Sequence, residues 1–487
     1  MKKLTIKVIA LLLAFIFVAF ATMACTIKKV DDETSGVDST TKAEATETES
    51  QLVKDGLADV NMNGTEFRIL SYLNDFTHGN SISEQVTGDV LNDAIYKTTI
   101  EIENRFNVEL VETIESSSYV NTESKVWAKA GTDEYDYIVI LDRSGLSWAQ
   151  EGLAVRYDNL PNIDLSKPYW DAGINKSVSI NNNYFMAAGA ANLTVYDYTN
   201  VLLFNKEMIE NNNLDNPYTL VDTNQWTFEK FDSMMQEVLA DNGDGVANEL
   251  DTYGFVTVGK QILPNMWVAA NEKSVTKDEN DIPYFSIFDS DKFLEVYDTV
   301  LNTMYDHNCW YQTTNSSNTW YNDIQLFESN QALFAGHTFY TAGDMRQRIS
   351  EFGIIPYPKY EETQDNYYSR VSGGIRMMLV PITNTRLEDT STIIEAINCA
   401  AYNYEVPAYY DVVLKSKTAN DEESARMLDI VLANRVYDLG DSYWYSIIRS
   451  SLFTTLFLNN NQSPVSTIRS CQTAIDQQIA NDIKPFE

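Results

Sequence analysis

The stretch from Tyr135 to Leu141 constrains the fold more than any other segment of the chain. Apart from Asp136 it is an unbroken run of apolar and aromatic residues, which predicts a strand buried on both faces. Such a strand belongs in a parallel sheet, whose neighbouring strands need crossover connections, usually helices, that cover the faces of the sheet. The segment therefore predicts an α/β fold.

The segments before this strand alternate between strand and helix patterns. Short apolar runs predict strands at 67–70 and 108–114. Apolar residues at helical spacing predict a helix at 90–106 and a weaker one at 119–130. Strands that alternate with helices are typical of three-layer α/β/α lobes.

A second unit of the same kind lies between residues 225 and 255. Thr227 can cap a helix at 228–239, because its hydroxyl can accept a hydrogen bond from an amide of the first turn. Turn residues at 241–245 end that helix, and a strand begins at Tyr253. Since 487 residues exceed the usual size of one domain, we expect two lobes.

The N-terminus has the features of an export signal. Lysines precede an apolar run at 8–20 that is too short to span a membrane and fits the core of a signal peptide at 1–24. The run 22–25, Thr-Met-Ala-Cys, resembles the lipobox of bacterial lipoproteins, which implies lipidation of Cys25. Plain secretion after cleavage at the small residues of 19–21 is the alternative.

Residues 25–59 are expected to form a disordered tether. Thr, Ser, Glu, Asp and Lys dominate this segment, and large apolar residues are few. It cannot bury enough apolar surface to offset the entropy lost on ordering. Together with the lipidated cysteine, the tether would hold the folded part at the extracellular face of the cell membrane.

Acidic residues outnumber basic ones twofold, with 70 Asp and Glu against 35 Lys and Arg and a net charge of −35. Such a charge repels phosphate backbones, so nucleic acid is not an expected partner. An acidic ligand would need a local basic patch. The chain is also rich in Tyr, Phe and Trp, whose flat rings suit ligand clefts.

The sequence lacks motifs for covalent chemistry and for cofactors. The four cysteines have no metal spacing, the three histidines form no zinc pair, and no nucleophile elbow, phosphate loop or dinucleotide fingerprint occurs. We therefore expect no enzyme activity and no cofactor. Asn242, Asp244 and Asp251 could ligate calcium, but Ala240 cannot serve at the first position of such a loop. A plain turn that ends the helix is the alternative.

Several runs carry a more specific resemblance. The Trp-Thr entry and the closing Tyr-Gly-Phe of 225–255, the Gly-x-x-x-Tyr-Asp, strand and Asp-Arg run of 131–143, and the runs 331–340 and 351–359 resemble the family 1 extracellular solute-binding proteins. These are the sugar-binding, maltose-binding-protein-like lipoproteins of ABC transporters. The resemblance implies a two-lobed periplasmic-binding-protein-like fold of type II, with α/β/α lobes joined by hinge strands and a helical C-terminus.

The resemblance also places the lobes along the chain. Residues 196–206 resemble the crossing into lobe two, and 372–374 open a second crossing. Only helices are expected after Tyr409. The implied boundaries are 60–200 and 373–405 for lobe one, and 201–372 and 406–487 for lobe two. The elements predicted near the C-terminus are a strand at 377–382 and helices at 388–404, 409–417, 422–434, 442–458 and 464–483.

Two residues at the end of the buried strand are the first candidates for a ligand site. Asp142 and Arg143 follow the carboxyl end of the strand, where open α/β sheets bind ligands. An acceptor pair and a planar donor fork suit hydroxyl-rich ligands, although a surface ion pair is the alternative. The resemblance implies further contacts from these residues: Trp148, Trp170, Tyr196, Asp197, Phe339, Tyr340 and Trp444. Core packing is the alternative for Trp170 and Trp444, and Tyr443 could replace the latter.

The resemblance implies a monomeric, lipid-anchored substrate-binding protein of an ABC importer. It would capture an extracellular carbohydrate, an oligosaccharide or a sugar derivative, in the cleft between the lobes and deliver it to the permease subunits. Two alternatives remain open. One is an anchored glycan-degrading enzyme that uses two cleft carboxylates, and the other is a surface protein that binds its ligand without import.

Overall fold

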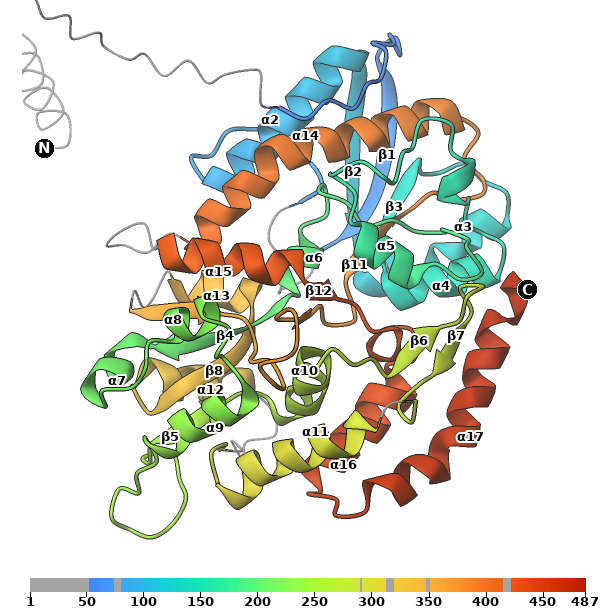
Figure 1. Cartoon of the computed structure of the whole chain (residues 1–487). Helices are drawn as coiled ribbons and strands as arrows, with labels where there is room; N and C mark the ends of the chain where they lie inside the picture. The colour runs from blue at the N-terminus through green and yellow to red at the C-terminus, as the bar shows by residue number, and fades with distance from the viewer. Residues whose placement is uncertain (1–51, 74–79, 290, 312–318, 347–350, 415–421) are drawn as a thin grey trace, which may run out of the picture. The chain divides into compact units, whose positions relative to one another are not determined.

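Four strands build the sheet of lobe one, in the order β11-β3-β1-β2 (Figure 1). β1 (Thr65–Tyr72) is parallel to both β2 (Val108–Glu115) and β3 (Tyr137–Leu141). β11 (Arg376–Leu379) runs antiparallel to β3 and comes from the C-terminal part of the chain. The side chains of Tyr137 to Ile140 are all buried, which confirms the strand predicted from the apolar run.

The computed structural model describes residues 52–73, 80–289, 291–311, 319–346, 351–414 and 422–487. The predicted signal peptide, Cys25 and the tether as far as residue 51 lie outside these ranges. Within the described ranges, no helix is both long and apolar enough to cross a membrane.

Residues 52–59 correct the prediction that the whole tether is disordered. The guanidinium of Arg105 pairs with Asp55 at 2.5 Å and with Asp59 at 2.7 Å. The backbone amide of Val53 donates to the side chain of Asn403 at 3.0 Å. These long-range contacts order the segment against lobe one in spite of its polar composition.

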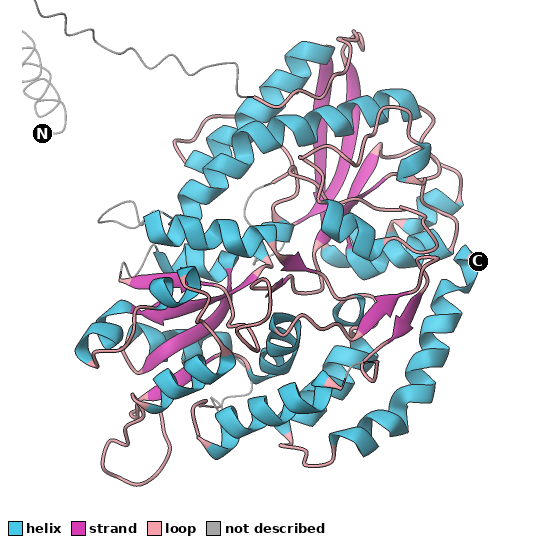
Figure 2. Ribbon diagram, in the orientation of Figure 1, coloured by secondary structure: helices cyan, strands magenta, loops and turns pink. Residues whose placement is uncertain are grey.

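Two long helices cover one face of this sheet (Figures 1 and 2). α2 (Val90–Phe106) has the predicted bounds, because Asp89 accepts a hydrogen bond from a first-turn amide and Asn107 adopts a left-handed conformation at its end. α14 (Leu387–Leu414) packs on α2 and passes through Pro407, so the helices predicted at 388–404 and from Tyr409 form one helix. Beyond the proline its residues enter the core of lobe two, and this tertiary packing overrides the local helix-breaking signal.

The second sheet has the order β5-β8-β4-β9. β5 (Tyr253–Val256) is parallel to β8 (Ala332–Thr338), and β4 (Asn200–Asn205) runs antiparallel to β8 and to β9 (Phe352–Ile355). The two sheets and their flanking helices form the two-lobed α/β arrangement that the sequence predicts (Figure 2).

The unit at 225–255 is part of the scaffold of lobe two. Thr227 caps α9 (Phe228–Gln236) by accepting a hydrogen bond from the amide of Lys230 at 3.2 Å. Trp226 is fully buried and donates its Nε1 hydrogen to the carbonyl oxygen of Pro356 at 3.0 Å. Gly254 lets the helix approach β5 closely, since a Cβ there would lie 2.3 Å from the Cβ of Met235.

The segments that cross between the lobes run side by side. Thr199 and Val371 form an antiparallel bridge, and the amide of Ser372 donates to the carbonyl oxygen of Tyr198 at 2.9 Å. The side-chain amide of Asn200 donates to the carbonyl oxygen of Arg370 at 2.9 Å. The segments at which the sequence places the crossings are therefore hydrogen-bonded neighbours.

The remaining elements include three departures from the sequence expectations. The helix at 119–130 is a π-helical turn, Tyr119–Glu123, followed by α3 (Lys125–Lys129), and the helix at 442–458 is a π-helical segment, Ser446–Phe453, followed by α16 (Thr454–Leu458). The C-terminal part also contains a strand, β12 (Arg435–Val436), which pairs with β10 (Ser369–Arg370). The other helices and strands are α4 (Asp142–Gln150), α5 (Ala172–Val178), α6 (Thr194–Asp197), α7 (Lys206–Asn211), α8 (Pro217–Asp222), α10 (Ile262–Ala269), β6 (Val275–Lys277), β7 (Pro283–Phe285), α11 (Lys292–Leu301), α12 (Thr319–Glu328), α13 (Phe339–Arg346), α15 (Glu422–Ala433) and α17 (Pro464–Ile483).

A buried acid–imidazole pair in lobe two makes stability depend on pH. Asp323 of α12 lies 3.6 Å from His337 of β8, and both side chains are almost fully buried. Burial raises the pKa of Asp323 to about 7 and lowers the pKa of His337 to about 4. Ionisation of Asp323 therefore weakens folding as pH rises from about 4 to about 7, whereas protonation of His337 weakens it as pH falls from about 6.5 to about 4.

Asp323→Asn should remove only the first of these effects. The natural protein should lose stability between about pH 5 and about pH 8, and the variant should not. The free energy of unfolding of the variant minus that of the natural protein should therefore be about 2 kcal/mol higher at about pH 8 than at about pH 5. Urea unfolding at the two pH values measures this difference. A relative stability that is the same at both would contradict the raised pKa of Asp323.

Candidate functional site

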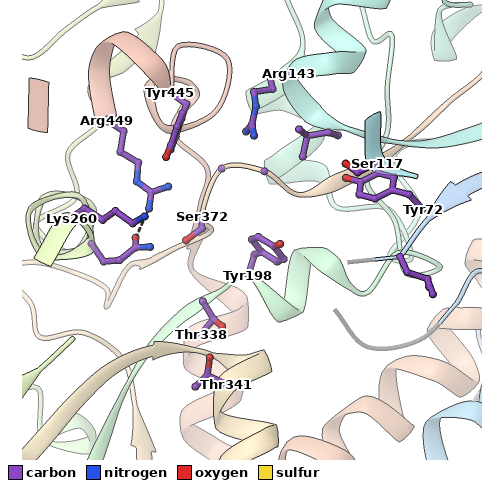
Figure 3. A pocket seen from close by; sticks show the side chains of 15 residues that line it. Tyr72, Ser117, Arg143, Tyr198, Lys260, Thr338, Thr341, Ser372, Tyr445 and Arg449 are labelled. Carbon is purple, nitrogen blue, oxygen red and sulfur yellow. Dashed lines mark hydrogen bonds between the residues drawn. The ribbon is translucent and has the colours of Figure 1, made fainter. Parts of the chain in front are cut away.

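A cavity of about 480 Å³ lies where the strands of the two sheets end (Figure 3). Its walls come from the segments that follow β1, β2, β3, β5 and β8, from both crossing segments, and from the C-terminal π-helical region. The residues that line it are Tyr72, Leu73, Ser117, Leu141, Arg143, Tyr198, Lys260, Gln261, Thr338, Thr341, Ser372, Gly373, Gly374, Tyr445 and Arg449.

Arg143 is the one residue of the predicted ligand-binding set that lines this cavity. β3 ends at Leu141 and α4 begins directly after it, so the side chain of Arg143 leaves the carboxyl end of the sheet. It is 42% exposed, and its guanidinium lies 5.4 Å from the centre of the Tyr445 ring. A cation over an aromatic face at this distance is attracted by the ring.

Asp142 corrects the prediction, because it is fully buried beneath the cavity wall. Its Oδ2 atom accepts hydrogen bonds at 2.7 Å from the amide of Gly374 and from the hydroxyl of Ser442, and a further one from the hydroxyl of Tyr437. The carboxylate therefore ties the end of β3 to a crossing segment and to the C-terminal region, and offers no surface to a ligand.

The predicted aromatic pair, Phe339 and Tyr340, does not face the cavity. Phe339 is fully buried in the core of lobe two, and Tyr340 is not among the lining residues. The polar residues on either side, Thr338 and Thr341, line the cavity instead. The segment is the predicted one, but the large apolar ring follows the usual preference for the core.

In the aromatic run 443–445, the residue that lines the cavity is again a neighbour of the predicted one. The indole of Trp444 is buried and donates its Nε1 hydrogen to Asp482 at 3.0 Å. The hydroxyl of Tyr443 donates to the carbonyl oxygen of Val178 at 3.1 Å. Tyr445, the next residue, lines the cavity.

The other predicted residues support the lobes and lie away from the cavity lining. Trp148 is fully buried 5.6 Å from the ring of Trp127, and the indole of Trp170 donates to Glu395 at 2.9 Å. Near the hinge, Tyr196 packs beneath the guanidinium of Arg435 and against Tyr409, and the hydroxyl of Tyr409 donates to the buried carboxylate of Asp197 at 2.9 Å.

Lys260, Gln261 and Arg449 are among the polar lining residues that the sequence prediction missed. Lys260 and Gln261 follow β5, and Arg449 belongs to the C-terminal π-helical segment. The guanidinium of Arg449 donates to the side chain of Gln261 at 2.7 Å and pairs with Asp441 at 3.1 Å. The position of Lys260 and Gln261 just after a strand end is a signal that could have identified them.

The acidic loop near 241–251 is organised by its own backbone. Asp251 accepts hydrogen bonds from the amides of Asn242 and Asn248, both at 2.9 Å, and Asp244 accepts from the amide of Val246 at 2.8 Å. Within the described ranges, no group of three or more His, Cys, Asp or Glu side chains could hold a metal ion. The loop has the hydrogen bonds of the plain turn.

No family model and no curated protein matches the chain by sequence. Solved structures do resemble it. The sugar-binding protein MalE from Xanthomonas citri has 11% identity and a TM-score of 0.61, covering 87% of this chain and 99% of its own. The GacH receptor of Streptomyces glaucescens, described unliganded and in complex with acarbose, has 10% identity and a TM-score of 0.55, covering 86% and 99%.

A third solved structure is an ABC substrate-binding protein from Listeria monocytogenes in complex with cycloalternan. It has 12% identity and a TM-score of 0.54, and covers 86% of this chain and 99% of its own. Because the alignments extend over nearly the whole of these proteins, the chain has the complete two-lobed fold of the maltose-binding-protein-like solute-binding proteins. The fold implied by the sequence motifs is thereby confirmed.

Proposed function

We propose that this protein, built on the fold of the sugar-binding proteins of ABC transporters, captures an extracellular carbohydrate in its cavity and delivers it to the permease of an importer. The observation that supports the proposal most is the position of the cavity. Strand ends from both sheets meet around it, so one ligand would contact both lobes.

The lining has the chemistry that a carbohydrate needs. The rings of Tyr72 and Tyr198 offer apolar faces to sugar C–H groups, and the hydroxyls of Thr338 and Thr341 can donate to and accept from sugar hydroxyls. A volume of about 480 Å³ is within the range of about 300–1,000 Å³ that is usual for small-molecule sites. A mono- or disaccharide unit would bury most of its surface there.

Ligand binding would couple to closure of the lobes. A ligand that touches both lobes stabilises the closed arrangement by the contacts that it makes only there. The crossing segments at Thr199 and Val371 would carry the hinge, because they run side by side from one sheet to the other. The closed form would then present its surface to the permease.

A panel of mono- and oligosaccharides tests the proposal by calorimetry and thermal shift. We expect at least one of them to bind stoichiometrically and to raise the melting temperature. Tyr445→Ala should weaken that affinity about tenfold or more, because it removes a ring that lines the cavity and that holds the guanidinium of Arg143 in place. Tyr284→Ala is the matched control, since Tyr284 is an exposed tyrosine on β7 outside the cavity lining. A panel with neither heat nor thermal shift would contradict carbohydrate binding.

A glycan-degrading enzyme is the competing function. Most glycoside hydrolases place two carboxylates across the scissile bond. The described residues that line the cavity include no Asp or Glu. Turnover of a chromogenic or polymeric glycan would favour the enzyme, and stoichiometric binding without turnover favours the importer component.

We further propose that a lipid on Cys25 anchors the protein at the extracellular face of the membrane, as the lipobox-like run Thr-Met-Ala-Cys suggests. Replacing this cysteine by serine should release the protein into the medium. Membrane retention of the Cys25→Ser variant would exclude the lipid anchor without affecting the carbohydrate proposal.

A further inference from the structure

The charge of the cavity lining is opposite to that of the chain. Among the described residues that line the cavity, Arg143, Lys260 and Arg449 are cationic and none is Asp or Glu. The whole chain has 70 acidic and 35 basic side chains, so a lining of average composition would contain two acids for each base. A basic cavity in an acidic protein attracts anions to that one place and repels them elsewhere.

Two of these cations can still contact a ligand. The side chain of Arg143 is 42% exposed, and its Nη1 atom lies 3.9 Å from Oδ1 of Asp142. The Oδ2 atom of Asp142 accepts hydrogen bonds from Gly374 and Ser442 instead. Lys260 is partly exposed and forms no ion pair with a carboxylate in the described part of the chain.

Behind the lining, buried charges of both signs lie close together. Asp441 pairs with both Arg370, at 2.7 Å, and Arg449, at 3.1 Å, and the three side chains are at most 7% exposed. Two further buried carboxylates, those of Asp142 and Asp438, lie near the same wall, so the buried groups carry no clear excess of positive charge. Arg376, also buried, donates to the carbonyl oxygen of Tyr72 at 2.7 Å and has no ion-pair partner among the described carboxylates. The positive charge that a ligand would meet therefore comes from Arg143 and Lys260 in the lining.

The ring of Tyr445 lies between two guanidinium groups (Figure 3). The centre of the ring is 5.4 Å from Arg143 and 5.2 Å from Arg449. Guanidinium groups held in place by a ring keep their planar donor forks available, and such forks match the oxygens of carboxylate and sulfate groups. A sugar bound in the cavity next to Tyr445 would place a charged substituent beside them.

We propose that the natural ligand is an acidic saccharide, whose carboxylate or sulfate group is bound by Arg143 and Lys260 in the cavity. This inference rests on the proposed function and names the substrate class of the same site. Its hydroxyls would be met by the neutral polar residues of the lining.

Matched ligand pairs test the inference with the full-length protein. Trigalacturonate is compared with galactotriose, and a sulfated disaccharide with its unsulfated form, by calorimetry. We expect at least one acidic member to bind about tenfold or more tightly than its neutral partner, because a hydrogen bond to a charged group contributes more than a neutral one. The two pairs distinguish a carboxylate from a sulfate, and inorganic sulfate alone tests for binding of the anion without the sugar.

Salt and charge variants provide the second readout. Raising NaCl from about 50 mM to about 500 mM should weaken binding of the acidic saccharide and leave a neutral saccharide unaffected. Arg143→Gln and Lys260→Gln should each lower the affinity for the acidic member about tenfold. Arg426→Gln is the matched control, since it removes an exposed cation of α15 that is not part of the lining. Melting curves without ligand verify that each variant is folded.

The outcomes separate this inference from the proposed function. Two results would overturn the inference and leave the carbohydrate proposal intact. One is that neutral saccharides bind as tightly as their acidic partners. The other is that neither Arg143→Gln nor Lys260→Gln changes the affinity for an acidic saccharide. Binding of inorganic sulfate with no saccharide binding, or no binding at all, would overturn both.

Discussion

Replacing Asp142 by alanine is expected to lower the free energy of unfolding by about 3–5 kcal/mol. The side chain is fully buried and accepts hydrogen bonds from the Gly374 amide and from the hydroxyls of Ser442 and Tyr437. Its Oδ1 atom also accepts from the amide of Arg143 at 2.6 Å. Alanine would leave these buried donors without an acceptor, which costs more than the loss of the bonds themselves.

Denaturant unfolding of the natural protein, Asp142→Ala and Asp142→Asn measures the effect. The asparagine variant should lose less, because it keeps one acceptor oxygen and fits the same space. Unchanged unfolding curves together with a loss of saccharide affinity would indicate that Asp142 binds the ligand directly. They would contradict the role of this carboxylate as a structural acceptor.

The elements of the fold were largely predictable because each depends on local patterns. The apolar run that ends at Leu141 is a buried strand, and α2 has the predicted bounds because Asp89 and Asn107 end it on both sides. The π-helical segments were not predictable, since the sequence there has the same spacing of apolar residues as an α-helix. The course of α14 through Pro407 depends on packing in lobe two, which no local pattern records.

The sequence predicted several of the segments that line the cavity, but in most of them it did not predict which residue faces the cavity. Large rings such as Phe339 and Trp444 are buried, whereas their neighbours Thr341 and Tyr445 line the cavity. A shift of one or two residues decides which side chain faces the cavity, and hydrophobicity favours the core for the largest rings. The rule that ligands bind beyond strand ends, applied to every strand, would also have pointed to Lys260 after β5.

Asp441→Ala is expected to be the second strongly destabilising change, at about 3–5 kcal/mol. Asp441 is the counter-charge of two buried guanidinium groups, those of Arg370 and Arg449, and it also accepts from the amide of Gly373 at 3.0 Å. Alanine would leave two like charges together in a region of low dielectric constant, where repulsion is strong. Denaturant unfolding at neutral pH measures the loss.

Asp222→Ala is the matched control for this prediction. Asp222 pairs with Arg426 at 2.6 Å, a distance close to that of the buried pair, but both side chains are at least 40% exposed. Exposed pairs contribute little because water and salt screen them, so the control should leave stability nearly unchanged. If the two substitutions had equal effects, the buried position of Asp441 would not matter to stability, and the prediction would be wrong. If only Asp441→Ala destabilises, the buried carboxylate is what holds the guanidinium of Arg449 at the cavity wall, 5.2 Å from the centre of the Tyr445 ring.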